Sequence, residues 1–263
     1  MKYRLIFFSI LLFSSGLTYS QRKTKLNTNG KGTLFGYVGY NRSAYTSSDV
    51  SFSSTNYDFI AGDMTFSDNQ EEVGMGSFFN STSPQFNIHL GYFVANKWAI
   101  TLGLDRLNYF SRNNQNVTFD GAFSPDAHSD FSGPYQNEEI VLNRSQLFLE
   151  QNGGVNYARI GLLRVDQLYK SRKAEFAVNT MVGVGIGALF SGLDYTFDNS
   201  KVQNVSSLSG FGISGQLGVR FDFFQHVFLQ LSLSGGLLNQ GNIQLSTDSS
   251  ETASHKMGYL SPE

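Results

Sequence analysis

The chain contains no cysteine and few charged residues, and its charges nearly balance. The absence of cysteine excludes disulfide bonds, thiolate zinc sites, cysteine nucleophiles and lipid attachment through an N-terminal cysteine. A net charge of −2 over 263 residues provides no basic surface for nucleic acid, so no nucleic-acid partner is expected. After residue 20 no apolar run reaches the roughly 18 residues of a transmembrane helix, which excludes a helical membrane protein.

The first 20 residues have the pattern of an export signal. Lys2 and Arg4 precede the apolar run LIFFSILLF, and Thr18-Tyr19-Ser20 is an acceptable cleavage site before Gln21. We therefore expect residues 1–20 to be a cleaved signal peptide and residues 21–31 to be a flexible periplasmic lead-in. Residues 32–263 then form a single β domain outside the inner membrane.

Abundant glycine and aromatic residues, with 27 Gly, 24 Phe and 13 Tyr, favour strands over solvated helices. Apolar and polar residues alternate strictly in QFNIHLGYF, WAITLGLD, FGISGQLGVRF and VFLQLSLS, and a period of two predicts strands. The polar face carries Gly, Ser, Asn, Gln and Thr with only isolated charges. This composition favours the narrow interior of a membrane barrel over the charged exterior of a soluble sandwich.

Short and long connections alternate along the chain. Short turns are expected at 94–97, 167–173 and 223–225, and long polar stretches at 46–83, 111–153, 192–207 and 239–255. This predicts an all-β fold, an eight-stranded antiparallel transmembrane β-barrel with long extracellular loops. The strands are expected near 32–45, 84–93, 98–110, 154–166, 175–191, 208–222 and 226–238, with an eighth from about 256. The segment NYDFIAGDM (56–64) could be a membrane strand in a competing register, but an extracellular extension is preferred.

These segments also resemble a family of small outer-membrane β-barrel proteins of Bacteroidetes. The stretches that carry the resemblance are GYVGYNRSAYTSSDVSF, NYDFIAGDM, PQFNIHLGYFVANKWAITLGLDRLNY, YQNEEIVLNRSQLFLEQNGGVNYARIGL and GVRFDFFQHVFLQLSLSGG. The family has no assigned reaction, so the resemblance implies the fold and the outer-membrane location but no chemistry. Its implied partners are outer-membrane lipid and lipopolysaccharide, and the barrel-assembly machinery during insertion. Such barrels typically end on an aromatic residue, whereas this chain stops at HKMGYLSPE. We therefore expect its last strand to be truncated, and a poorly closed seam between the first and last strands is the alternative.

Histidine is too scarce to suggest an obvious catalytic site. Pairing Tyr92 with Trp98 across the VANK turn would leave His89 and Asp105 four residues apart, about 13 Å, too far for a dyad. His226 lies at a predicted periplasmic turn and His255 near the chain end. The run His128-Ser129-Asp130 cannot form a triad, because adjacent residues do not converge on one another. No catalytic, metal-binding or cofactor-binding residues are therefore proposed.

Charged and amide side chains on the polar face are expected to meet inside the barrel and to fill it with hydrogen bonds. The predicted lumen network comprises His89, Asp105, Arg159, Arg220, Asn179, Gln216 and Gln230. A narrow pore for ions or small solutes is the alternative interpretation of these residues.

The long loops contain clustered aromatic and acidic residues that suit either contact with surface molecules or packing into an extracellular β-extension. The candidate contact residues are Tyr57, Asp58, Phe59, Tyr135, Glu138, Asp194 and Tyr195. The sequence thus favours a non-enzymatic outer-membrane protein that acts through its loops. A lipid A or phospholipid hydrolase with an undetected rim site is kept as an alternative.

The stretch MVGVGIGALF (181–190) spaces Gly183, Gly185 and Gly187 every second residue. A phosphate-binding loop needs a different spacing and a strand that stops at its first glycine. We interpret this segment as a continuous strand whose glycines face the crowded interior.

Overall fold

The computed structural model describes residues 28–69, 85–125, 130–173, 175–224, 226–247 and 250–263. The predicted signal peptide and most of the predicted lead-in therefore lie outside the described residues. The described chain is all-β, and all of its strand pairs are antiparallel. No helix among these residues is long and apolar enough to cross a membrane.

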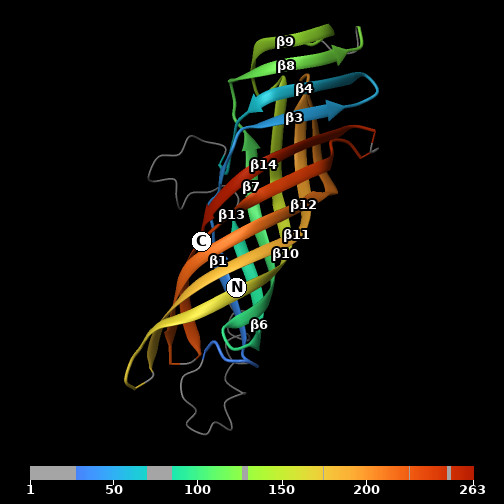
Figure 1. The fold of residues 1–263 in the computed structure, drawn as a ribbon. Coiled ribbons are helices and arrows are strands. Elements are labelled where there is room, and N and C mark those ends of the chain that lie inside the picture. Colours follow the sequence, from blue (N-terminus) through green and yellow to red (C-terminus); the bar gives the residue numbers. More distant parts are fainter. Residues whose placement is uncertain (1–27, 70–84, 126–129, 174, 225, 248–249) are drawn as a thin grey trace, which may run out of the picture.

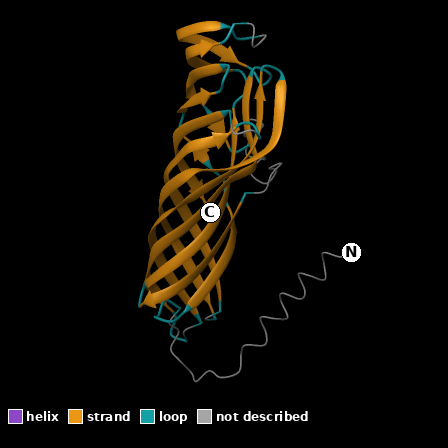
Figure 2. Cartoon of the chain, turned by 90° about the vertical axis from the view of Figure 1, so that its right-hand side faces the viewer, coloured by secondary structure: helices purple, strands orange, loops and turns teal. Residues whose placement is uncertain are grey.

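Eight strands form a long curved wall (Figures 1 and 2). In spatial order they are β1 (Leu34–Tyr40), β6 (Phe86–Ala95), β7 (Trp98–Ser111), β10 (Leu147–Lys170), β11 (Phe176–Phe197), β12 (Ser200–Phe223), β13 (Val227–Gln244) and β14 (Thr252–Pro262). The short β2 (Ala44–Tyr45) follows β1 in the chain and pairs with β14. Hydrogen-bonded pairing therefore connects the last wall strand to the segment that follows the first. We call these strands the wall.

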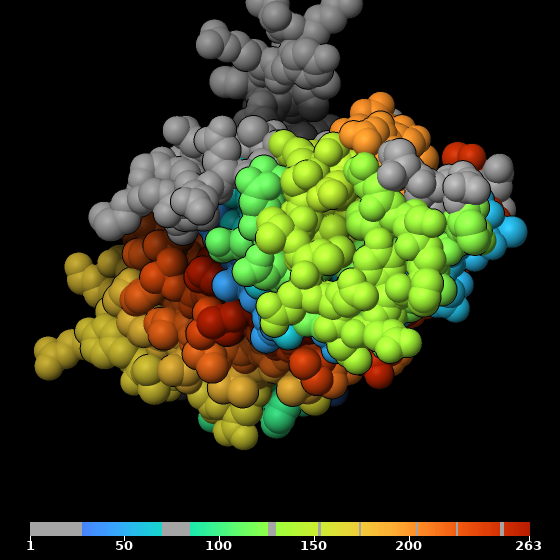
Figure 3. Space-filling view, turned by 90° about the horizontal axis from the view of Figure 1, so that it is seen from above, coloured from blue at the N-terminus to red at the C-terminus, as the bar shows by residue number. Residues whose placement is uncertain are grey.

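The remaining strands form an extension beyond one end of the wall, which we call the head. It contains β3 (Ser48–Ser53), β4 (Tyr57–Met64), β8 (Gln115–Phe123) and β9 (Gly133–Leu142), while β5 (Phe66–Ser67) pairs with β7. In the view from above, the green colours of β8 and β9 occupy much of the face (Figure 3). The segment 56–64 thus belongs to the head, as preferred from the sequence, and pairs with β3 and β8.

The expected number of eight strands is therefore wrong for the described chain, whose sheet holds fourteen strands. The eight predicted segments correspond to the wall strands, but the stretches expected to be loops are themselves largely strand. β10 and β12 begin earlier than predicted, and β11 and β13 end later. Their outer ends continue as strands because they pack with the head around a shared aromatic core.

This head core consists of closely packed rings. Phe59 stacks on Phe52 with 4.8 Å between ring centroids and on Phe119 with 4.7 Å. Phe131 and Phe197 stack at 5.6 Å. Each of these five rings is at most 7% exposed, and they belong to one apolar core that the head shares with the adjoining ends of the wall strands.

The wall has the opposite arrangement of polarity. Apolar side chains such as Leu102 (60% exposed) and Leu217 (59%) point outwards, while Arg220 (1%) and Asp105 (3%) are buried inside. The alternation predicted from the sequence is confirmed for these strands. β11 also continues unbroken through Gly183, Gly185 and Gly187, so MVGVGIGALF is a strand and not a phosphate-binding loop.

Candidate functional sites inside the wall

The largest buried charge cluster lies around Arg159 of β10. The Arg159 Nε atom is 2.6 Å from Asp105 Oδ2, and the other Asp105 oxygen lies 2.7 Å from His89 Nε2. Glu263 Oε1 is 4.0 Å from Arg159 Nη2. The Tyr37 ring stacks on the His89 imidazole with 4.8 Å between centroids. Four strands thus meet in one ionic cluster, which we call the central cluster.

The sequence prediction that His89 and Asp105 are too far apart is wrong. The turn after β6 is a tight Asn96-Lys97 pair with a bulge before it, so Tyr92 pairs with Ile100 and not with Trp98. Lys97 adopts a left-handed φ of 71°, which the tight turn requires. This shift places Asp105 opposite Asn87, two residues from His89 along the strand, where the two side chains meet diagonally.

Glycines make room for the large side chains of this interior. A Cβ on Gly103 would overlap the His89 ring, and one on Gly39 would overlap the Asn87 amide. A Cβ on Gly185 would come within 3.3 Å of the Arg159 side chain. Two of these glycines pair directly across the ladder with the residue they accommodate, His89 with Gly103 and Asn87 with Gly39. The glycine spacing therefore reflects packing beneath polar side chains of neighbouring strands.

Amide and hydroxyl groups complete the central cluster. Gln216 Nε2 donates to Glu263 Oε2 over 3.3 Å, and the Ser232 hydroxyl donates to the same oxygen over 3.0 Å. Gln230 in turn donates to the Ser232 hydroxyl. The predicted residues Gln216 and Gln230 thus belong to this cluster. Gln216 contacts Glu263 directly and Gln230 contacts it through Ser232. Glu263 was considered in the sequence only as the last residue.

A second cluster, separate from the first, lies at the end of the wall opposite the head. Asp222 Oδ1 is 2.8 Å from Arg220 Nε, and Asp222 Oδ2 accepts hydrogen bonds from Asn179 Nδ2 and from the Thr28 hydroxyl. The predicted pair Arg220 and Asn179 is therefore joined by Asp222, which sequence reasoning missed. We call this group the lower cluster.

The last residues of the predicted flexible lead-in are fixed to this end of the wall. Asn29 is 7% exposed; its Nδ2 donates to the Val165 carbonyl, and its own carbonyl accepts from Lys97 N over 2.8 Å. Thr28 contacts both members of the Arg220–Asp222 pair. Thr28 and Asn29, in the range predicted to be a lead-in, thus contact this end of the wall.

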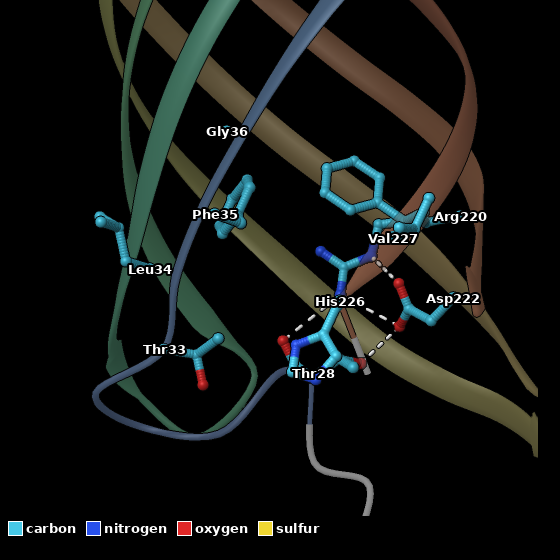
Figure 4. A pocket seen from close by; sticks show the side chains of 10 residues that line it. Thr28, Thr33, Leu34, Phe35, Gly36, Arg220, Asp222, His226 and Val227 are labelled. Carbon is cyan, nitrogen blue, oxygen red and sulfur yellow. Dashed lines mark hydrogen bonds and ion pairs between the residues drawn. The ribbon is translucent and has the colours of Figure 1, made fainter. Parts of the chain in front are cut away.

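One cavity of about 220 Å³ adjoins the lower cluster (Figure 4). Thr33, Phe35 and Gly36 of the β1 region line one side of it, and His226, Val227 and Phe228 line the other. Arg220 Nη1 is buried at this cavity and has no hydrogen-bond partner among the described residues. The Arg220 guanidinium lies 4.9 Å from the Phe228 ring centroid, which gives a cation–π contact but no acceptor for Nη1.

A serine, a histidine and an amide meet near the head. The Ser48 hydroxyl lies 3.1 Å from His255 Nδ1, and His255 Nε2 lies 2.8 Å from Gln240 Oε1. In this geometry the ring donates from Nε2 to the Gln240 amide oxygen and accepts at Nδ1 from the Ser48 hydroxyl. This group was not predicted, because its members are distant in the chain.

This arrangement lacks the properties of a nucleophile and base. The partner of the His255 Nε2 atom is the neutral amide of Gln240, which does not stabilise an imidazolium as a carboxylate does. Ser48 is 6% exposed and His255 is 5% exposed, and neither lines the described cavities. The group is best explained as a buried hydrogen-bond network between wall and head.

The candidate contact residues of the loops have different environments. Tyr57, Phe59 and Tyr195 are each at most 3% exposed in the head core, and so are not available to a surface partner in this arrangement. Asp194 is buried and lies 3.5 Å from Lys201 Nζ. Asp58, Glu138 and the partly buried Tyr135 remain at the surface.

His128 and Ser129 of the run His128-Ser129-Asp130 lie outside the described residues. Within the described ranges, no three His, Cys, Asp or Glu side chains are grouped so as to hold a metal ion. Comparison with models of known protein families and with curated protein sequences finds no match to this chain.

Proposed function

We propose that this chain is an integral outer-membrane β-barrel protein that acts without catalysis, through a protruding head that contacts surface molecules. The observation that carries the proposal is the reversed polarity of the wall, with leucine and valine outside and ion pairs inside. Soluble monomers rarely expose apolar patches of this extent, whereas membrane barrels alternate apolar-out and polar-in along every strand.

The apolar exterior forms a band around the wall. Its members point outwards from seven of the eight wall strands: Val38, Leu90, Leu102, Ile160, Val184, Leu217 and Leu231 are between 51% and 74% exposed. Tyr92, Trp98, Tyr169 and Phe224 lie exposed near the turns at the end opposite the head. Such rings suit the interface between lipid and water, where membrane barrels carry aromatic girdles.

The interior, which is filled by side chains, favours a barrel without a water-filled channel over a pore. The central and lower clusters occupy successive levels of the interior, and an eight-stranded barrel is only wide enough to be filled by its side chains. We therefore propose a structural barrel and expect no stable single-channel conductance in planar bilayers. A steady conductance that changed on neutralising Asp105 would favour the pore alternative instead.

Membrane insertion is tested by fractionation. The chain should appear in the outer-membrane fraction, resist extraction by carbonate, and migrate differently on gels before and after boiling. Recovery in the soluble fraction, with no effect of boiling, would contradict the proposal.

Orientation is tested with two epitope insertions. A tag between Asp198 and Asn199, in the turn joining β11 and β12 at the head end, should bind antibody on intact cells. A matched tag beside Arg172, in the turn joining β10 and β11 at the opposite end, should bind only after the outer membrane is permeabilised. Equal labelling of both tags on intact cells would contradict an outward-facing head.

A further inference from the structure

A hollow of about 440 Å³ lies on the outer face of the wall, towards the head ends of β10, β11 and β12. The Phe190 and Leu208 side chains, 46% and 60% exposed, form its apolar side, and Asn156 and Ser206 supply an amide and a hydroxyl. Pockets of about 300–1,000 Å³ that combine apolar surface with a few polar groups are typical sites for small ligands. We call this hollow the outer groove.

The outer groove exists because small residues lie side by side on three strands. Gly192 of β11 pairs with Gly154 of β10 on one side and with Ser206 of β12 on the other. The next paired row towards the opposite end of the wall consists of Asn156, Phe190 and Leu208. The outward surface therefore drops from a row of large side chains to a row with almost none.

The outer groove lies where the apolar band ends. On β11 the exposed apolar residues run from Val182 to Phe190, which is nine residues, and a membrane strand has about 9–11. The next outward positions on this strand are Gly192 and Asp194. A molecule in the groove therefore contacts apolar surface on one side and polar surface on the other.

Two exposed cations lie on the polar side of the groove. The carboxylates of Glu150 and Asp194 pair across the ladder and are only 8% and 9% exposed. Lys201 Nζ lies 3.5 Å from Asp194 Oδ2, and Arg144 Nη2 lies 3.8 Å from Glu150 Oε2. These two basic side chains are 42% and 50% exposed, so the surface presents positive charge. Asp194 is two residues beyond Gly192, which is about 7 Å along the strand.

The three parts of this surface suit one amphipathic molecule. An aromatic ring beside an amide and a hydroxyl can pack against the apolar face of a sugar and bind its hydroxyl groups. Exposed arginine and lysine side chains bind phosphate. The apolar band beyond Phe190 and Leu208 can contact acyl chains. A soluble sugar phosphate would leave this band uncovered, and a fatty acid would leave the sugar-binding groups without a partner.

We propose that the outer groove binds the headgroup of a glycolipid whose sugar carries a phosphate. The sugar packs against Phe190 and forms hydrogen bonds with Asn156 and Ser206. Its phosphate binds Lys201 and Arg144, and its acyl chains lie along the apolar band. The proposal rests on the proposed outer-membrane location, which places this band in lipid.

The proposal is tested with lipid probes and the full chain refolded in amine-oxide micelles. Native mass spectrometry should show one tightly bound copy of diphosphorylated lipid A per chain. Three further probes each lack one part: phosphatidylglycerol lacks the sugar, glucosyl diacylglycerol lacks the phosphate, and glucosamine 1-phosphate lacks the acyl chains. Each should bind at least ten-fold more weakly. Equal affinity for any of the three, or no binding of lipid A, would overturn the proposal.

A charge variant tests the phosphate contact. Lys201→Gln should weaken the binding of lipid A about ten-fold and leave that of glucosyl diacylglycerol unchanged, because only the phosphate loses a partner. The matched control is Arg164→Gln, which removes a cation that is 49% exposed and paired with Asp166 in the part of β10 far from the head. It should bind lipid A like the native chain. Equal weakening in both variants would overturn the proposal, since it would indicate attraction to positive charge in general.

A second variant fills the groove. Ser206→Phe places a ring in the hollow and should reduce lipid A binding at least ten-fold, with heat-modifiable migration retained as the sign of folding. Ser53→Phe makes the same change at an exposed position of β3 in the head and should leave binding unchanged. Native affinity in a folded Ser206→Phe variant would overturn the proposal. Binding in micelles is measured independently of cell fractionation, so failure of this proposal is distinguishable from failure of the proposed outer-membrane location.

Discussion

Arg159 is the only cation that contacts both Asp105 and Glu263 among the described residues. Replacing it with methionine leaves two buried carboxylates without their counter-charge, and breaking such a pair costs about 3–5 kcal/mol. We expect Arg159→Met to lower the free energy of unfolding by that amount, measured by urea titration in micelles. The control is Arg164→Met on the same strand, whose exposed ion pair with Asp166 should contribute little. Equal effects would show that the central cluster does not stabilise the wall.

Gly103 tests the packing of glycine beneath large inward side chains. A Cβ at this position overlaps the His89 ring, so Gly103→Ala should lower stability by about 1–3 kcal/mol through overpacking. Gly215 is the matched control, because it faces outwards and its nearest heavy atoms are 4.0 Å from a Cβ. Gly215→Ala should be neutral or slightly stabilising. Unfolding titrations in the same detergent measure the free energy of unfolding of both variants. An equal decrease in the two would contradict the packing explanation.

At the residue scale, the sequence predicted which side chains are buried but not how they are joined. Alternation placed Arg159, Arg220 and Asn179 inside the wall correctly. The contact between His89 and Asp105 was missed because one bulge before the Asn96-Lys97 turn shifts the ladder. Asp222 and Glu263 were missed as partners because side-chain packing, and not periodicity, determines which inward groups meet.

The head and the adjoining ends of the wall strands share one apolar core, and replacing a single ring tests how far its disruption spreads. Phe59 lies at the centre of the stacked aromatic rings of the head, whereas its neighbour Ile60 points outwards at 42% exposed. Phe59→Ala should destabilise the head by about 3–5 kcal/mol and expose it to limited proteolysis, leaving the wall folded. Ile60→Ala should leave the digestion pattern unchanged. Unfolding of the wall together with the head in Phe59→Ala would contradict local unfolding of the head.

At the element scale, the strands of the wall were predictable because one face is apolar and the other polar throughout. A β-extension formed by the loops was considered from the sequence, but no strand bounds were predicted for the outer parts of β10 to β13 or for the strands of the head. Their apolar residues, such as Phe52 and Phe59, are buried against one another within a polar stretch of sequence. Such a pattern is read as a loop until tertiary packing is known.

At the scale of the whole molecule, the wall and the head differ in which side chains they bury and which they expose. The wall exposes leucine and buries arginine, and the head buries phenylalanine and exposes acidic residues such as Glu138. This difference fits the proposed location, in which lipid surrounds the wall and water surrounds the head. The boundary between them can be located by placing charge on outward-facing residues of each part.

Leu102 and Val141 provide this comparison. Both are apolar and similarly exposed, at 60% and 58%, but Leu102 lies in the apolar band of β7 and Val141 in β9 of the head. In lipid, an arginine costs about 2–4 kcal/mol near the bilayer midplane, whereas in water an exposed arginine costs almost nothing. Leu102→Arg should therefore reduce the heat-modifiable, outer-membrane-inserted fraction, and Val141→Arg should insert like the native chain. If both variants inserted equally well, the apolar band would not be the lipid-facing surface, because water would then solvate both positions alike.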